Sequence, residues 1–137
     1  MIVYRESVAG IEASQLRGFF ADPPWPNPPT PETHLRLLRG SDHVVLAVDD
    51  ESKQVVGFVT AVGDGVLSAY LPLLEVLPAY RGRGIGGELV RRMLDRLADL
   101  YMVDLVCDPE LEPFYARFGL RPAHAMVRRN YARQSGA

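Results

Sequence analysis

Three residue types, cysteine, lysine and tryptophan, occur only once each in this chain. Its 137 residues include one cysteine, Cys107, one lysine, Lys53, and one tryptophan, Trp25. A lone cysteine cannot form an internal disulfide, so the cysteine content gives no sign of an oxidising compartment. No apolar run approaches the roughly 20 residues that a membrane-spanning helix needs, and Met1 is not followed by a charged and then apolar leader. We therefore expect a cytoplasmic protein that does not associate with membranes.

The chain also has a small net charge and no cluster of metal-ligand residues in its sequence. The net charge is -2, which gives no electrostatic case for nucleic acid or an anionic membrane as a partner. The histidines His34, His43 and His124 are too dispersed for a metal site, and we expect His34 to be solvated rather than catalytic. Hydrophobic residues make up 47%, enough for a single globular domain over residues 1–137, with 131–137 as a frayed tail.

The first quarter of the chain is divided by proline. An apolar stripe predicts a helix over residues 11–20. Residues 21–30 then hold five prolines around Trp25. Because proline lacks an N–H and fixes φ, this segment must be a stiff, extended loop. Thr30 as N-cap and Pro31 as the first helical residue begin a second helix.

Three apolar runs follow and predict strands. Residues 44–48 and 55–62, joined by a polar turn, predict an antiparallel hairpin. A tight turn at 63–65 leads into a third run over 66–77. Pro72 interrupts this run and indicates a β-bulge or the splayed edge of a sheet.

The stretch from 73 to 97 is the organising element of the sequence. It combines a strand, a bend at a proline, a glycine-rich turn and an amphipathic helix whose apolar face belongs to the core. The first backbone N–H groups of a helix have no internal acceptor, and the helix dipole is positive at that end. The turn is therefore suited to the phosphates of a cofactor. Its glycines are Gly82, Gly84, Gly86 and Gly87.

Two families of phosphate-binding turn fit these glycines. Gly82-x-Gly84-x-x-Gly87 satisfies the dinucleotide fingerprint, with Asp104 near the position of its ribose-binding acid. However, a dinucleotide fold opens with this turn and needs several further β-α units, whereas only about fifty residues follow here. No Lys-Ser or Lys-Thr follows the glycines, so a P-loop is excluded.

A second pattern in the same glycines fits the rest of the sequence better than the dinucleotide fingerprint does. Arg81-x-x-Gly84-x-Gly86, preceded by an apolar strand, resembles the turn of the GNAT superfamily of acetyl-CoA-dependent N-acetyltransferases. About thirty residues downstream, Phe114-Tyr115-x-x-x-Gly119-Leu120 is similar to a second segment of that family, with leucine in place of its usual phenylalanine. The resemblance covers the chain from about residue 43 to 131.

This resemblance implies an α/β fold. The GNAT fold is a single-layer mixed sheet of about six or seven strands with about four helices, splayed between its two central parallel strands. Residues 102–107 then form a strand parallel to the one that enters the glycine turn. Residues 123–131 could return as a last antiparallel strand.

The family also implies acetyl-CoA as co-substrate, with no metal. The strand that enters the turn would pair with the pantetheine arm, and the turn itself would hold the phosphates on N–H groups from Arg83 to Gly87. The residues expected to bind the cofactor are Leu74, Glu75, Val76, Leu77, Arg81, Gly82, Arg83, Gly84, Ile85, Gly86 and Gly87.

Acetyl transfer requires an acid for the departing thiolate and removal of a proton from the amine. Tyr115 matches the position at which many family members place a tyrosine beside the sulfur, and it is our candidate acid. Glu75 is the candidate base, since a carboxylate in an apolar strand is costly unless it is used. Alternatively it recognises an ammonium group, has a structural role, or leaves proton removal to a water chain. Trp25 and Tyr70 are candidate walls of the acceptor site.

The sequence therefore predicts an N-acetyltransferase that moves an acetyl group to a primary amine, preferably on a small molecule, by direct attack in a ternary complex. The alternatives are a protein or peptide N-acetyltransferase and a non-catalytic acetyl-CoA-binding module. The acceptor's identity and the acyl-chain preference stay open. So does the oligomeric state, with which a homodimer is compatible.

Overall fold

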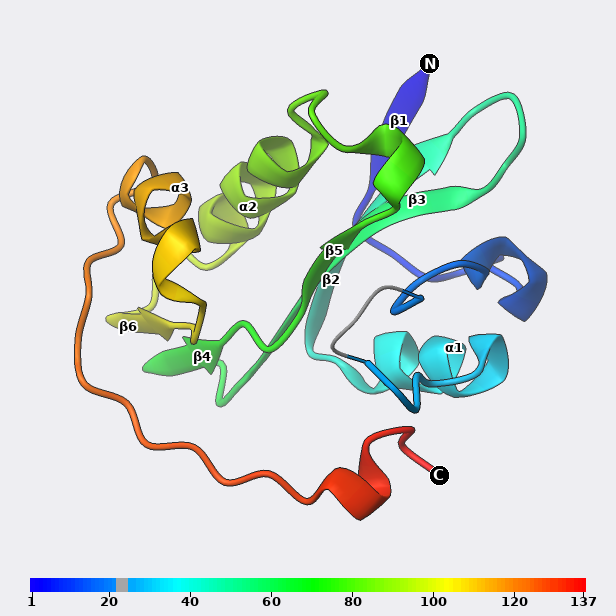
Figure 1. The fold of residues 1–137 in the computed structure, drawn as a ribbon. Helices are drawn as coiled ribbons and strands as arrows, with labels where there is room; N and C mark the ends of the chain where they lie inside the picture. The colour runs from blue at the N-terminus through cyan, green and yellow to red at the C-terminus, as the bar shows by residue number, and fades with distance from the viewer. Residues whose placement is uncertain (22–24) are drawn as a thin grey trace.

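A mixed six-stranded sheet lies at the centre of the computed structural model, which describes residues 1–21 and 25–137 (Figure 1). The strand order is β1-β2-β3-β4-β6, with β5 also paired to β3, and only β4 and β6 are parallel. The strands are β1 Ile2–Arg5, β2 His43–Asp49, β3 Val55–Gly63, β4 Ser68–Tyr70, β5 Leu74–Val76 and β6 Met102–Asp104. The α-helices are α1 Pro31–Gly40, α2 Ile85–Arg96 and α3 Glu112–Ala116, and the 3-10 helices are η1 Ala13–Leu16, η2 Pro78–Tyr80, η3 Pro109–Leu111 and η4 Tyr131–Arg133.

The central strands are buried on both faces. Side chains alternate along a strand, so Val44, Leu46 and Val48 of β2 join the core beneath α1, whereas Val45 and Ala47 join the core beneath α2. Strands covered on both faces have continuous apolar runs, which explains the hydrophobic pattern of the predicted hairpin. The hairpin is confirmed, since β2 and β3 pair antiparallel.

The helices of the first quarter agree with the predictions in part. α1 begins as predicted, and the Thr30 hydroxyl accepts a hydrogen bond of 3.2 Å from the third helical N–H. The helix predicted over 11–20 is wrong in extent, because only the 3-10 turn Ala13–Leu16 forms. Gly18 and Phe20 adopt positive φ angles of 91° and 62°, which no α-helix can accommodate.

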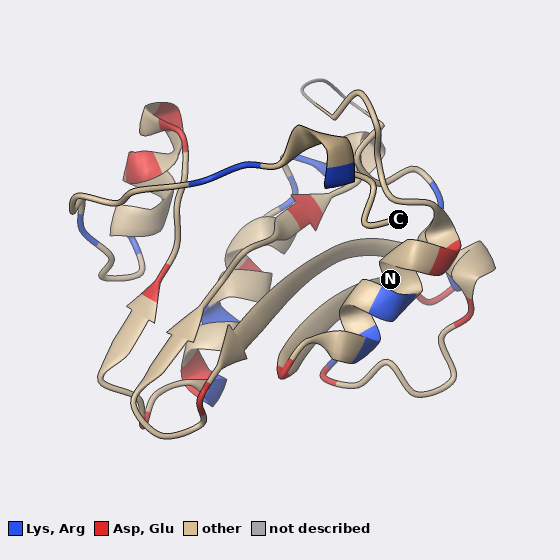
Figure 2. Ribbon diagram, turned by 90° about the horizontal axis from the view of Figure 1, so that it is seen from below, with Lys and Arg blue, Asp and Glu red and all other residues tan. Residues whose placement is uncertain are grey.

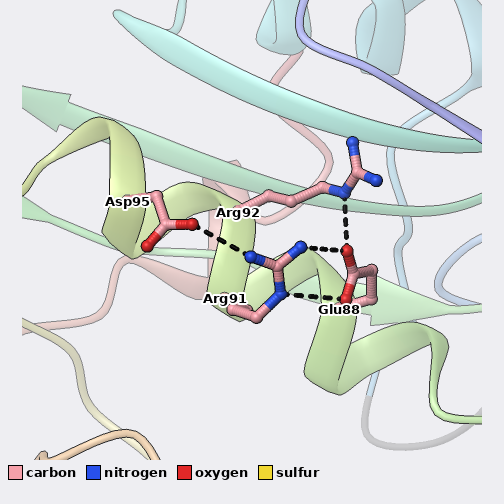
Figure 3. Close-up of polar contacts among 4 residues, drawn as sticks. All are labelled: Glu88, Arg91, Arg92 and Asp95. Carbon is pink, nitrogen blue, oxygen red and sulfur yellow. Dashed lines mark hydrogen bonds and ion pairs between the residues drawn. The ribbon is translucent and has the colours of Figure 1, made fainter.

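The exposed face of α2 carries a small network of ion pairs (Figure 3). Glu88 accepts from Arg92 at 2.8 Å, which confirms the i,i+4 arrangement of the sequence, and it also binds Arg91. Arg91 bridges onward to Asp95 at 3.0 Å. The two arginines hold the pKa of Glu88 well below its usual range, with Arg91 the larger cause. Pairs of this kind stabilise a helix by about 0.2–0.5 kcal/mol each.

The run predicted as one strand over 66–77 is two strands, separated at Pro72. β4 pairs with the end of β3, and β5 pairs with its beginning. The parallel partner of β6 is β4, not the β5 segment that enters the glycine turn. Beyond Asp104 the chain is no longer in a strand, so β5 keeps β3 as its one strand neighbour. This opening corresponds to the predicted splay of the sheet.

The C-terminal end differs most from expectation. Residues 123–131 were predicted to return as a last antiparallel strand, and this is wrong. Residues 121–130, here named the C-terminal arm, form no strand and are all exposed, and Tyr131 begins η4. The arm runs along the outside of the molecule from α3 toward α1 (Figure 1). Residues 131–137, predicted to fray, include the 3-10 helix η4, and Gly136 approaches Thr33 of α1. The sheet therefore has six strands, and the described residues form three α-helices instead of about four.

A search of the described residues finds no helix with the length and apolarity that crossing a bilayer requires.

His34 was predicted to face solvent, and this is wrong. It is 1% exposed and lies among aromatic rings, with Phe58 at 4.6 Å and Phe19 at 5.1 Å between centroids. Its Nε2 has no hydrogen-bond partner among the described residues. Burial lowers the pKa of His34 to about 4, although a hydrogen bond with the Leu16 backbone opposes the shift.

We expect this histidine to make the fold sensitive to acid. Because the folded pKa lies below the unfolded value of about 6.5, neutral His34 stabilises the protein above pH 6.5, and that contribution is lost as the pH falls toward 4. Between pH 7.5 and 4.5 the loss is about 2–3 kcal/mol, measurable by urea unfolding. His34→Phe should lose correspondingly less stability over this interval. The exposed His124→Gln is the control and should behave as wild type.

Candidate active site

The glycine turn has a backbone that other residues cannot adopt without strain. Gly82 and Gly84 have φ angles of 78° and 80°, in the left-handed region. A Cβ at either position would meet no atom within 4 Å, so the space in front of the turn is open. Gly84 is the N-cap of α2, and the first N–H groups of that helix have no acceptor within it. The turn can therefore receive an anionic group.

One side chain of the β2-β3 hairpin, Asp49, holds the segment before this turn in place. The Tyr80 hydroxyl donates to Asp49 Oδ2 at 2.8 Å, and the Arg83 guanidinium lies 5.0 Å from the Tyr80 ring centroid. The hydrogen bond from Tyr80 is the main reason that the pKa of Asp49 is lowered. Sequence reasoning missed this support, since nothing local connects Asp49 with a tyrosine thirty-one positions later.

The two sequence patterns meet at the first turn of α2. A Cβ on Gly86 would lie 3.8 Å from both Val76 of β5 and Phe114 of α3. A Cβ on Gly87 would lie 3.6 Å from Phe118. These glycines therefore allow α3 to pack beside the beginning of α2, which places Tyr115 near the opening of the sheet.

Gly57 in β3 is a further residue that the sequence analysis did not identify. A Cβ there would lie 3.1 Å from Leu89 and 3.2 Å from the backbone oxygen of Glu75. Because glycine has no Cβ, α2 and β5 can lie close to β3 at this position. A glycine within an apolar strand is the signal that could have indicated this close approach.

Glu75 and Trp25 line one pocket of about 160 Å³, although fifty positions separate them in the sequence. Arg81 also lines it, and its Nε donates to the Val76 carbonyl at 3.1 Å. The Arg81 guanidinium therefore contacts β5, the strand that enters the glycine turn. The full lining is Gly18, Phe19, Phe20, Ala21, Trp25, Glu75, Val76, Leu77, Pro78 and Arg81.

Tyr115 lies half-buried on α3, close to Glu75 and to Cys107. Burial, with smaller contributions from Cys107 and Glu75, raises the pKa of Tyr115 to about 12. Burial and the nearby Glu112 and Asp108 raise the pKa of the Cys107 thiol. At neutral pH the site therefore contains a protonated phenol and a protonated thiol.

Tyr70 is not brought to this pocket. It lies on β4, opposite Val62 of β3 and Asp104 of β6, and lines neither the first pocket nor its neighbour. The structure thus brings Trp25 and Glu75 into one pocket, places Tyr115 near Glu75 but outside the lining of that pocket, and leaves Tyr70 apart.

A second pocket of about 380 Å³ adjoins the first and shares Phe20 and Trp25 with it. Two cationic residues line it, Arg36 from α1 and Arg133 from η4, and neither forms an ion pair with a carboxylate of the described residues. Sequence reasoning missed both, because they meet only through the return of the C-terminal segment to α1. The remaining lining is Pro29, Thr33, Leu37, Leu73, Gln134 and Gly136.

Metal ligands are not clustered in the described part of the chain. In residues 1–21 and 25–137 no group of three or more His, Cys, Asp or Glu side chains is arranged to hold an ion.

Comparison with known families and structures agrees with this geometry. Residues 10–120 match the model of the acetyltransferase (GNAT) family. A crystal structure from Deinococcus radiodurans R1, assigned as an acetyltransferase, has 49% identity and a TM-score of 0.94, covering 99% of this chain and 93% of the other. A GNAT family acetyltransferase from Streptococcus pneumoniae has 26% identity and a TM-score of 0.76, covering 95% of this chain and 98% of the other.

Curated relatives are more distant. Glucosamine 6-phosphate N-acetyltransferase 1 of rice is 31% identical over an alignment 112 residues long, which covers 69% of this chain and 66% of the relative. The chloroplastic GCN5-related N-acetyltransferase 1 of Arabidopsis thaliana is 25% identical over 117 residues, 84% of this chain and 59% of the relative. The chain therefore spans about three fifths to two thirds of these proteins.

Proposed function

Because the chain belongs to the GNAT family of acetyltransferases, we propose that it transfers an acetyl group from acetyl-CoA to the primary amine of a small molecule. The observation that carries the proposal is that the neighbours of Glu75 and Tyr115 along the chain, Val76 and Phe114, both pack at Gly86 beside the glycine turn, and that Glu75 is near enough to affect the pKa of the Tyr115 phenol. Between them Glu75 and Tyr115 provide a proton acceptor and a proton donor, which are the two groups that amine acetylation requires.

The described residues suit acetyl-CoA. Backbone N–H groups at the beginning of α2, from Arg83 to Gly87, would hold its phosphates. The edge of β5 that does not face β3 would pair with the pantetheine arm, since a sheet edge accepts an added extended segment. The Val76 backbone would lie beside the thioester carbonyl.

Glu75 and Tyr115 then have separate roles, as base and as acid. Acetyl-CoA supplies an activated acyl group as a thioester. Glu75, directly or through water, takes the proton of the ammonium group, so that the amine nitrogen can bond to the carbonyl carbon. As the carbon–sulfur bond breaks, Tyr115 donates its hydroxyl proton to the departing sulfur. The nitrogen of the new amide loses its second proton to water, and water reprotonates the Tyr115 phenolate. The raised pKa of Tyr115 keeps the phenol protonated at neutral pH.

A small acceptor is favoured over a peptide by the walls of the site. Phe20 and Trp25 pack at 4.6 Å between ring centroids and line both pockets, so these two aromatic rings form part of the wall beside Glu75. The rice relative, whose name gives a phosphorylated amino sugar as its acceptor, supports the same class. The test is release of free CoA in the presence of an amine panel, with mass spectrometry of the acetylated product. No turnover with any amine would contradict the proposal.

We further propose that the acceptor carries an anionic group, bound by Arg36 and Arg133 in the second pocket. Arg36→Gln should raise KM about tenfold or more for an amine that carries phosphate or carboxylate, because a hydrogen bond to a charged group contributes about 1.5–3 kcal/mol. KM for the matched neutral amine should not change. Arg39→Gln is the control, since Arg39 is exposed on the same helix but lines neither pocket. An equal rise in KM for both amines would contradict the anion site.

A further inference from the structure

We propose that Phe20 is a specificity-determining residue, whose ring divides the acceptor site in two and sets the separation between the amine and the anionic group of an accepted molecule. The inference deepens the proposed function and rests on it, because it takes the ammonium end to lie beside Glu75 and the anionic end beside Arg36 and Arg133. The acceptor is then a compact molecule with a positive charge at one end, a negative charge at the other and an apolar middle.

The backbone of Phe20 has a conformation that a bulky side chain rarely adopts. Its φ is 62°, and in the described part of the chain only Lys53 shares a positive φ among residues other than glycine. This conformation is costly for an L residue and persists only where the surrounding structure enforces it. Strained residues of this kind are concentrated at ligand sites. Since a glycine would relieve the strain but supply no ring, the strain points to a requirement for the ring at this position.

Three other rings fix the position of the Phe20 ring. Its centroid lies 4.6 Å from that of Trp25, 5.5 Å from that of His34 and 6.1 Å from that of Phe58. Aromatic pairs at these distances attract one another in addition to burying apolar area. His34 belongs to α1 and Phe58 to β3, and Phe20 is only 4% exposed. The ring is therefore a fixed wall, held against both a helix and the sheet.

This wall stands where the two pockets meet. Phe20 and Trp25 are the only described residues that line both. The pocket of about 160 Å³ contains Glu75, and the pocket of about 380 Å³ contains Arg36 and Arg133. The helices that supply the two arginines, α1 and η4, carry basic residues, blue in Figure 2. An acceptor that contacts the carboxylate and a guanidinium therefore passes along two aromatic rings, and an apolar middle suits that path.

The neighbouring ring, Phe19, has similar packing but a different place in the site. It is 7% exposed and its centroid lies 5.1 Å from those of His34 and Phe58. It lines only the smaller pocket, and its φ is not positive. Loss of the Phe19 ring should therefore weaken the same aromatic cluster without joining the two pockets.

The test is the binding of straight-chain ω-amino acids, from glycine to 8-aminooctanoate, by isothermal titration calorimetry in the presence of CoA. In the wild type we expect one preferred length, with a Kd about tenfold or more higher for the chain that is two methylene groups shorter, since a single methylene can change binding tenfold. Phe20→Ala should bring this ratio close to one, because a shorter chain can then cross directly between the pockets. The n-alkylamines of the same lengths, which have no anionic end, should show no preferred length in either protein.

Phe19→Ala is the matched control. It should weaken all members of the series to a similar degree and so keep the wild-type ratio. Because Phe20→Ala removes a buried ring, Phe20→Leu is a second variant that keeps most of the apolar volume. It should retain the wild-type circular dichroism spectrum and lower the ratio in the same direction, but less.

An unchanged ratio in both Phe20 variants would overturn the inference. An equal loss of the ratio in Phe19→Ala would also overturn it, and so would failure of every ω-amino acid to bind the wild type. Turnover separates this inference from the proposed function. A series that binds with the expected preference but is not acetylated would contradict acetyl transfer, while still supporting the division of the site by Phe20.

Discussion

Gly84→Glu should weaken acetyl-CoA binding by about a hundredfold or more, measured by isothermal titration calorimetry. Gly84 has a φ of 80° and is the N-cap of α2. A side chain there costs about 1–3 kcal/mol of backbone strain. Its carboxylate would also face the pyrophosphate across the space that the glycine leaves open, and repulsion between unit charges at 4 Å is about 4 kcal/mol near a protein surface.

Gly65→Glu is the matched control. Gly65 has a φ of 74°, and a Cβ there would also meet no atom within 4 Å, but it lies in the turn between β3 and β4. The two variants add the same charge at a similar positive φ, so a difference in acetyl-CoA affinity between them reports the position of the glycine. Gly84→Ala separates strain from charge and should weaken binding less than Gly84→Glu. Equal affinities for the two glutamate variants would remove the turn from the cofactor site.

Tyr115→Phe should lower kcat about a hundredfold while leaving the Kd for acetyl-CoA nearly unchanged. A positioned general acid contributes about 10²–10⁴-fold to a rate. The change removes only the hydroxyl, and the ring can keep its edge contact with Phe114, 4.9 Å away between centroids. Tyr101→Phe is the control, because that side chain is 84% exposed before β6. Unchanged turnover in Tyr115→Phe would remove the phenol from the mechanism.

The pH profile gives a second test of the same residue. The pKa of Tyr115 is raised to about 12, and the protonated phenol is the active form. Activity that depends on it is therefore retained as the pH rises and lost only as the pH approaches 12. Steady-state rates should show no alkaline loss attributable to Tyr115 between pH 7 and 10. A loss in this range that disappears in Tyr115→Phe would contradict the raised pKa.

The local features of this fold were predictable from the sequence. The N-cap at Thr30, the apolar runs of β2 and β3, and the amphipathic α2 each depend on residues within a few positions of one another. The glycine turn is also a local feature, because the glycines that its backbone conformation requires lie within a few residues of one another. The pattern of Pro72 indicated an irregularity correctly, but not that two separate strands would form.

The features that sequence analysis missed depend on contacts across long separations. His34 is buried because Phe19 and Phe58 close around it, which no periodicity within α1 reveals. Arg36 and Arg133 share a pocket only because the chain beyond the arm returns to α1. The last strand was predicted from weak alternation, but residues 121–130 pair with no strand of the sheet.

The most direct test of the central claim is a comparison of thermal stability with acetyl-CoA, CoA and NADH. A ligand at a hundredfold its Kd stabilises the fold by about 2.7 kcal/mol, which raises Tm by several degrees in a domain of this size. We predict a rise in Tm with acetyl-CoA and with CoA and none with NADH. A rise with NADH alone, or none with any of the three, would contradict the assignment of the glycine turn to acetyl-CoA.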